Sequence, residues 1–240
     1  MRAPNAQKEA LKPWLKRRDC IPAKENARFV WRREDVLDVY QRPYDPKRPQ
    51  VCLDEASTQL LAEARPALPM QFGQPLRQDY EYVRQGTASL FMCFEPLVGR
   101  PHVQARARRT KLDFAYVIKD LVDLHYPEAE GIVLVLDNLN THTPASLYQA
   151  FPPAEAKRLA DKLEIHYTPE HGSWLNMAEI ELSVVGRQCL KRRLPDLDTL
   201  CAETRAWEAT RNGCPARVDW RFTTNDARIR LKRLYPSIQH

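Results

Sequence analysis

The sequence predicts an α/β domain on a mixed five-stranded sheet, with three antiparallel strands, two parallel strands and helices on both faces. Residues 131–142, GIVLVLDNLNTH, contain an unbroken apolar run that is typical of a strand buried on both sides. Residues 87–95 and 102–109 indicate two strands joined by a turn at 96–101. Helical patterns separate the later strands, which favours parallel pairing through right-handed crossovers.

The first third of the chain combines a polar lead-in with the first strand. Residues 1–49 are basic and proline-rich, with one helical pattern at 28–40, and are too short and polar for a core of their own. Residues 50–54, QVCLD, predict the first core strand. Residues 57–85 contain three prolines and Gly73, so we expect a meandering insertion with only a short strand near 80–83.

The remaining elements follow the apolar spacing. In the strand at 102–109, apolar residues alternate with Gln104, Arg106 and Arg108, which predicts one cationic face. A strand is predicted at 163–167, and helices are predicted at 111–126, at 144–162 with a break at Pro152 and Pro153, at 175–190 and at 196–212. We therefore expect one catalytic domain at 50–215 and a basic tail at 216–240.

Composition indicates an intracellular protein with a polyanionic partner. The 240 residues include 37 Lys and Arg against 31 Asp and Glu, a net charge of +6. Six cysteines without a CxxC pair predict reduced thiols, and we expect neither a signal peptide nor a membrane span. Clustered cations suit phosphate contacts, although any single cluster is more often a solvated face. The clusters considered for DNA are Arg106, Arg108, Arg109 and Lys111, and then Arg187, Lys191, Arg192 and Arg193.

Two predicted strands each end in an aspartate. Asp54 follows the first strand and Asp137 follows the strand at 132–136. If these strands are parallel neighbours, the two carboxylates meet at one edge of the sheet, and they repel unless a cation lies between them. Hard oxygen ligands suit Mg²⁺ or Mn²⁺, and two such ions can support phosphoryl displacement. The alternative is that Asp137 only begins a turn.

A third carboxylate from another element would complete such a site. Glu179 and Glu181 both lie near the start of the predicted helix at 175–190. The helical spacing does not choose between them, and either could be an ordinary exposed glutamate.

Three sequence blocks together resemble the active-site motifs of bacterial insertion-sequence transposases related to mariner elements, in the DDE superfamily with an RNase H-like fold. The blocks are LDE at 53–55, LDNLNTH at 136–142 and TPEHGSWLNMAEIE at 168–181. The resemblance implies that Asp54, Asp137 and Glu179 are the catalytic, metal-binding acids, with Glu181 in reserve. It also implies two Mg²⁺ or Mn²⁺ ions and no covalent protein intermediate.

The resemblance implies further roles and partners. Residues expected in the second shell or at the substrate are Asn138, His142, His171, Trp174 and Asn176. Double-stranded DNA is the expected substrate, a homodimer is the expected assembly, and the nucleoid is the expected location. Residues 1–49 leave no room for the helix-turn-helix domains of such transposases, so we expect a fragment, or a separate polypeptide that supplies them. The rival functions are a silent DNA-binding remnant and another RNase H-like nuclease.

Overall fold

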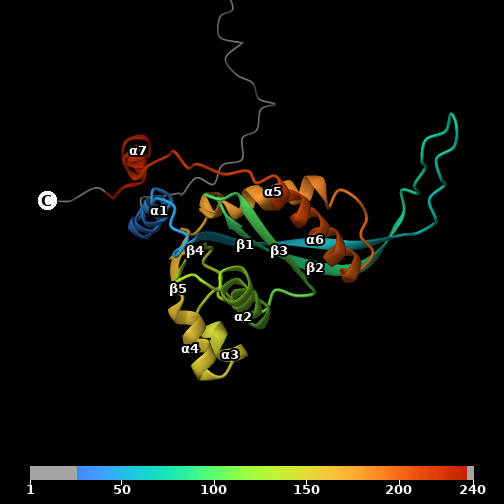
Figure 1. Cartoon of the computed structure of the whole chain (residues 1–240). Helices are drawn as coiled ribbons and strands as arrows, with labels where there is room; N and C mark the ends of the chain where they lie inside the picture. The colour runs from blue at the N-terminus through green and yellow to red at the C-terminus, as the bar shows by residue number, and fades with distance from the viewer. Residues whose placement is uncertain (1–25, 237–240) are drawn as a thin grey trace, which may run out of the picture.

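The computed structural model describes residues 26–236, and its centre is a five-stranded sheet with the order β3-β2-β1-β4-β5 (Figure 1). The first three strands pair antiparallel, while β4 and β5 run parallel to β1. This confirms the predicted mixed sheet. The strands are β1 (Gln50–Glu63), β2 (Tyr82–Glu95), β3 (Arg100–Arg106), β4 (Ile132–Leu136) and β5 (Leu163–Tyr167).

Helices cover both faces of the sheet, and each face buries its own apolar cluster (Figure 1). One face carries α2 (Lys111–Asp120), its π-helical continuation Leu121–His125, α3 (Ala145–Ala150) and α4 (Pro153–Asp161). The other carries α1 (Ala27–Tyr40), α5 (Ala178–Gln188), α6 (Leu197–Gly213) and α7 (Thr224–Arg230). Alternate residues of a strand point to opposite faces, so Cys52 lies on the α5 face and Leu53 on the α2 face.

Local signals explain where the helices begin. Thr110 and Asp113 form a capping box at the start of α2, and Asp196 accepts a hydrogen bond from the Thr199 amide at the start of α6. Pro153 occupies the first turn of α4, where its missing N–H is not needed. The prediction of a helix broken at Pro152 and Pro153 is therefore confirmed.

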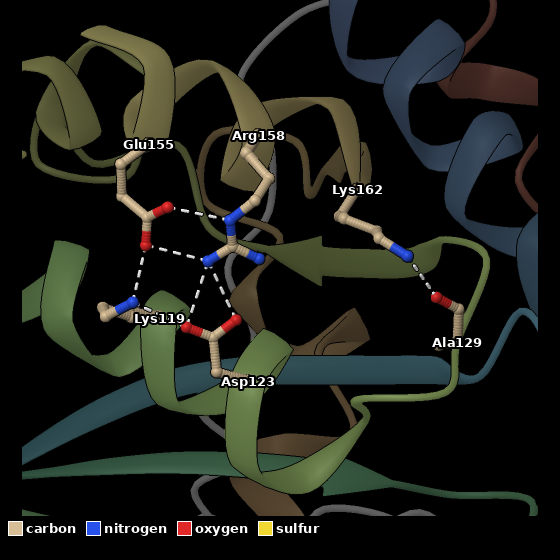
Figure 2. A network of polar contacts seen from close by, with 6 residues as sticks. All are labelled: Lys119, Asp123, Ala129, Glu155, Arg158 and Lys162. Atoms are coloured by element: carbon tan, nitrogen blue, oxygen red, sulfur yellow. Dashed lines mark hydrogen bonds and ion pairs between the residues drawn. The ribbon is translucent and has the colours of Figure 1, made fainter. Parts of the chain in front are cut away.

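An ion-pair network ties α4 to α2 (Figure 2). The Lys119 ammonium lies 2.6 Å from carboxylate oxygens of both Asp123 and Glu155. The Arg158 guanidinium contacts the same two carboxylates, at 2.9 Å for Asp123 and 2.8 Å for Glu155. The four side chains are partly exposed, so the network orients α4 more than it stabilises the fold.

The prediction for residues 57–85 was wrong, because β1 continues to Glu63 and β2 begins at Tyr82. We call residues 59–87 the hairpin arm. It projects away from the body of the molecule (Figure 1), and its turn at 64–81 holds the prolines. The two strands of the arm pair with each other although they are far apart in sequence. Local strand propensity does not predict such pairing. The strand predicted at 102–109 similarly ends at Arg106, and irregular residues 107–109 lead to the cap of α2 at Thr110.

Residues on both sides of segment 50–215 contact the core cluster on the α5 face. Val36, Leu37 and Val39 of α1 are fully buried in the cluster on the α5 face, and Trp220 and Phe222 pack against the same cluster. Within residues 26–236 all five cysteines are free thiols, while Cys20 lies outside this range. No helix in the described part of the chain is long and apolar enough to cross a membrane.

Candidate active site

The pairing of β1 with β4 brings two aspartates together. The parallel register aligns Cys52 with Val135 and Leu53 with Leu136, so Asp54 and Asp137 are the next residues on adjacent strands. Cys52 and Val135 face α5, and the alternation of the strands places Asp54 on that face two residues later. The site therefore lies at the carboxyl edge of the parallel strands, beneath α5.

Asp54 is the most buried of the three predicted acids. It is 9% exposed, and one of its oxygens accepts a hydrogen bond of 2.8 Å from the Glu55 amide. Burial, and then the negative charges of Asp137, Glu179 and Glu55, raise the pKa of Asp54 from 3.8 to about 7. The charges that act most strongly on this carboxyl are thus all negative, and Asp137 and Glu179 both lie within electrostatic reach of Asp54.

Asn176 fixes the start of α5 against β1 where its pairing with β4 ends. Its Nδ2 donates to the carbonyl oxygen of Leu53 at 2.7 Å, and its Oδ1 accepts from the Ala178 amide at 3.1 Å. Because Leu53 directly precedes Asp54, this buried amide sets the position of the first turn of α5 relative to the aspartate. Glu179 lies in that turn and is exposed.

Glu181 has a structural partner. It is 1% exposed, and its two oxygens accept hydrogen bonds of 3.0 and 2.7 Å from the Arg211 guanidinium of α6. Two residues along a helix correspond to a rotation of about 200°, so Glu181 points away from the side that carries Glu179. The two glutamates that the sequence left open therefore differ clearly in their surroundings.

His142 lies behind Asp137 and is fully buried. Its Nδ1 is hydrogen-bonded to Oδ1 of Asp137, and its Nε2 lies 2.8 Å from Oε2 of Glu55. The second contact has ion-pair distance but not the direction of a good hydrogen bond. Burial alone lowers the pKa of His142, but the contacts with Asp137 and Glu55 outweigh it and raise the pKa to about 9.

Glu55 was not identified as a functional residue by the sequence analysis. The signal that was available is its position in β1, next to Asp54, since adjacent strand residues face opposite sides of the sheet. Glu55, the residue beside Asp54 in β1, therefore points into the opposite layer.

The other predicted substrate residues are exposed near the site. Asn138 follows Asp137, and His171 and Trp174 lie in the loop before α5. Trp174 is 49% exposed, and His171 has a φ of 60°, which is uncommon for a residue other than glycine. Both side chains are therefore available to a ligand rather than used in the core.

The predicted DNA-binding cations fall into two groups. Arg106 pairs with Asp120 at 3.6 Å, Arg192 pairs with Glu203, and Arg193 holds Glu63 of the hairpin arm at 2.6 Å. Arg187 donates to the hydroxyl of Ser183. The side chains of Arg108, Arg109, Lys111 and Lys191 make no ion pair within residues 26–236.

The acidic site fits a divalent cation by its chemistry. Asp54 lies within electrostatic reach of Asp137 and Glu179 and lacks a cationic partner among its strongest neighbours, and all the donors are hard oxygens. Within the described range, however, no three Asp, Glu, His or Cys side chains are arranged closely enough to enclose a metal ion.

Such an acidic edge on a mixed sheet is typical of enzymes that bind divalent cations. Residues 49–201 match the family model described as DDE superfamily endonuclease. The match covers more than half of the chain, and the chain belongs to this family. A comparison with curated proteins found no match.

Solved structures of a mariner transposase share the fold. The Mos1 mariner paired end complex with Mn aligns with a TM-score of 0.52 and 16% identity, over 82% of this chain and 59% of that chain. The Mos1 transposase paired-end complex with left transposon end gives 0.53 and 15%, over 85% and 60%. The mariner Mos1 paired end complex with Mg gives 0.54 and 16%, over 93% and 68%. This chain thus spans about three fifths of the first two relatives.

Proposed function

We propose that this chain is the catalytic domain of a bacterial insertion-sequence transposase that cleaves DNA strands at the element ends and joins them to a target. The observation that supports the proposal is that Asp54 lies within electrostatic reach of Asp137 and Glu179, in a chain that belongs to the DDE superfamily endonuclease family. We further propose one catalytic unit that includes α1 and α7, because their side chains share the core of the sheet.

Asp54, Asp137 and Glu179 would hold two Mg²⁺ or Mn²⁺ ions. When bound, such ions activate the attacking oxygen and stabilise the leaving oxygen of an in-line phosphodiester displacement. The chain's own residues position these acids. Asn176 places the turn that carries Glu179, and His142 holds one oxygen of Asp137. Glu179 is preferred to Glu181 because Arg211 already neutralises Glu181 in the interior.

The proposed DNA contacts are the predicted cations without an intramolecular ion pair: Arg108, Arg109, Lys111 and Lys191. Arg106, Arg187, Arg192 and Arg193 are weaker candidates because a phosphate would have to compete with their present partners. Each phosphate contact that is lost should make the dependence of affinity on salt less steep. The slope of DNA affinity against salt can be measured by fluorescence anisotropy with duplex DNA between about 50 and 200 mM salt. An Arg108→Ala, Arg109→Ala double variant should give a less steep slope than the wild type.

We propose that the chain forms a homodimer through the hairpin arm. Phe72 is 108% exposed, Tyr80 is 85% and Met70 is 75%. All three belong to the hairpin arm, which projects from the body (Figure 1). Apolar surface of this kind is favourable to bury against a second copy. Sedimentation of the wild type should give a dimer, and Phe72→Ser with Met70→Ser should give a monomer. A monomeric wild type would contradict the proposal.

Recognition of the element ends is proposed to come from helix-turn-helix domains in a separate polypeptide, and the site of action is proposed to be the nucleoid. Electrophoretic mobility shifts with that polypeptide test the first point. The complex should retard DNA that carries the terminal repeats at concentrations where the catalytic domain alone shows no sequence preference. Equal preference without the partner would contradict it.

The decisive test is metal-dependent nicking of supercoiled plasmid. The wild type should nick in Mg²⁺ or Mn²⁺ and not in EDTA. Asp137→Asn and Glu179→Gln should abolish nicking, and Glu179→Gln should leave the fold intact because this side chain is exposed. Asp219→Asn, an exposed aspartate in the segment after α6, is the matched control. A wild type that binds DNA but never nicks, even with the partner polypeptide, would favour a silent remnant.

A further inference from the structure

Glu55 and His142 form a buried polar chain behind the proposed active site. The side chain of Glu55 is 3% exposed and that of His142 is 0% exposed, with 2.8 Å between Oε2 of Glu55 and Nε2 of His142. The other imidazole nitrogen contacts Oδ1 of Asp137. A buried carboxylate is costly unless it is paired, so this arrangement needs a reason beyond simple packing.

The imidazole is held from several sides. Its ring packs against Phe114 of α2, with 4.8 Å between ring centroids. The backbone carbonyl of His142 accepts a hydrogen bond of 2.9 Å from the Tyr167 hydroxyl of β5, and its amide donates to Leu139 at 3.0 Å. A ring fixed in this way presents Nδ1 to Asp137 in one orientation only.

The two neighbouring carboxylates of β1 therefore face different layers. Asp54 points toward α5 and the other acids, whereas Glu55 points toward α2 and His142. The polar contacts of Asp137 within residues 26–236 are both made by Oδ1, which accepts from His142 and, at 3.3 Å, from the Leu139 amide. Its Oδ2 has no partner in that range.

We propose that Glu55 is a positioning residue that acts through His142 to fix the orientation of the Asp137 carboxylate for cation binding. The proposal rests on the proposed function of the acidic site. Glu55 anchors Nε2, the anchored ring directs Nδ1 to Oδ1 of Asp137, and Oδ2 stays turned away from the imidazole. Loss of a residue that orients a metal ligand commonly weakens metal affinity by roughly 10- to 100-fold.

The test is a double-mutant cycle on Mn²⁺ affinity, measured from the electron paramagnetic resonance signal of free Mn²⁺. The variants are Glu55→Gln, His142→Asn and the double variant. We expect Glu55→Gln to weaken Mn²⁺ binding about tenfold in the folded protein. His142→Asn should weaken it similarly, and adding Glu55→Gln to His142→Asn should change it less than about twofold.

Three results separate the possible failures. If Glu55→Gln lowers the melting temperature without metal but leaves Mn²⁺ affinity unchanged, Glu55 is only structural and the inference is overturned. If the two substitutions weaken binding independently, Glu55 does not act through His142. If the wild type does not bind Mn²⁺, or Asp137→Asn binds it as well as the wild type, the proposed metal site itself fails together with the inference.

A second variant keeps the test decisive if Glu55→Gln does not fold. Glu55→Asp keeps the negative charge beside His142 but shortens the side chain by one methylene, so charge neutralisation survives while the 2.8 Å contact is lost. The same tenfold weakening, roughly, is expected. Wild-type Mn²⁺ affinity in this variant would show that charge alone matters and would overturn the positioning role.

Discussion

Replacing Asp54 with asparagine should stabilise the metal-free protein above neutral pH. The pKa of this carboxyl rises from 3.8 to about 7 on folding, mainly through burial and then through the neighbouring negative charges. A group whose pKa is raised in the folded state binds more protons there than in the unfolded state, so stability falls as pH rises from 3.8 through 7. The asparagine does not ionise and avoids this loss.

The size of the effect follows from the same pKa. Each pKa unit corresponds to ~1.4 kcal/mol, so the full rise corresponds to ~4 kcal/mol. Local relaxation and water access reduce this figure, and we expect Asp54→Asn to gain about 2 kcal/mol or more at pH 8. The shape is conserved, since the new amide oxygen can still accept from the Glu55 amide.

Urea unfolding in EDTA, followed by tryptophan fluorescence, measures the difference in free energy of unfolding between Asp54→Asn and the wild type. The series should run from about pH 4 to pH 8, the range in which this carboxyl titrates. The gain should be near zero at the acid end and largest at the alkaline end. Asp219→Asn, which removes an exposed charge, should show no such trend. In Mn²⁺ the order should reverse, because the ion stabilises only the wild type. A variant no more stable than wild type at pH 8, or a gain independent of pH, would refute the reasoning.

Three further predictions concern contacts away from the acids. Glu181→Ala leaves the Arg211 guanidinium without its buried partner, and urea unfolding should show a free energy of unfolding lower by about 3 kcal/mol. A decrease below about 1 kcal/mol would mean that the ion pair is not desolvated. Arg193→Ala removes the contacts with Glu63, Tyr80 and Glu81 of the hairpin arm, so amide exchange should quicken in residues 59–87 while the global free energy of unfolding stays within about 0.5 kcal/mol of wild type. Unchanged exchange there would show that these contacts do not hold the arm. Hydrogen bonds from Arg158 and then Lys119 hold the pKa of Glu155 at about 2 instead of 4.5, so this carboxylate stabilises the fold above pH 4.5 and loses that effect as pH falls through 2. Glu155→Gln should therefore lower the melting temperature at pH 7 and match wild type in strong acid, and an offset that persists in acid would contradict the ionic origin.

The sheet and its two aspartates were predictable because short segments of sequence carry the signal for each of them. A short β-branched run that ends in a carboxylate indicates a buried strand and an acidic strand end, and the parallel register then brings Asp54 beside Asp137. For the third acid, the local sequence pattern left two candidate glutamates. Glu179 and Glu181 share the same short stretch, and the partner that separates them, Arg211, comes from a helix 30 residues further on.

The hairpin arm and the Glu55 contact were not predicted, because both depend on pairing between distant segments. The strands of the arm are stabilised by each other across 18 intervening residues, and the turn residues between them suggested irregular structure. The role of Glu55 depends on a histidine that comes 87 positions later. Neither relation leaves a periodic pattern in the sequence.

The contact between Asn176 and Leu53 has a consequence for when the protein becomes competent during synthesis. Asp54 and Glu179 are 125 positions apart (179 − 54 = 125), and the helix that carries the glutamate packs on the first strand through apolar contacts and through this late amide. A growing chain can therefore form the strands with both aspartates while it still lacks the third acid. Long-range contacts of this kind are also slow to form. In the proposed function, the site is complete only after translation has passed α5, and prematurely terminated chains would lack the third proposed acid.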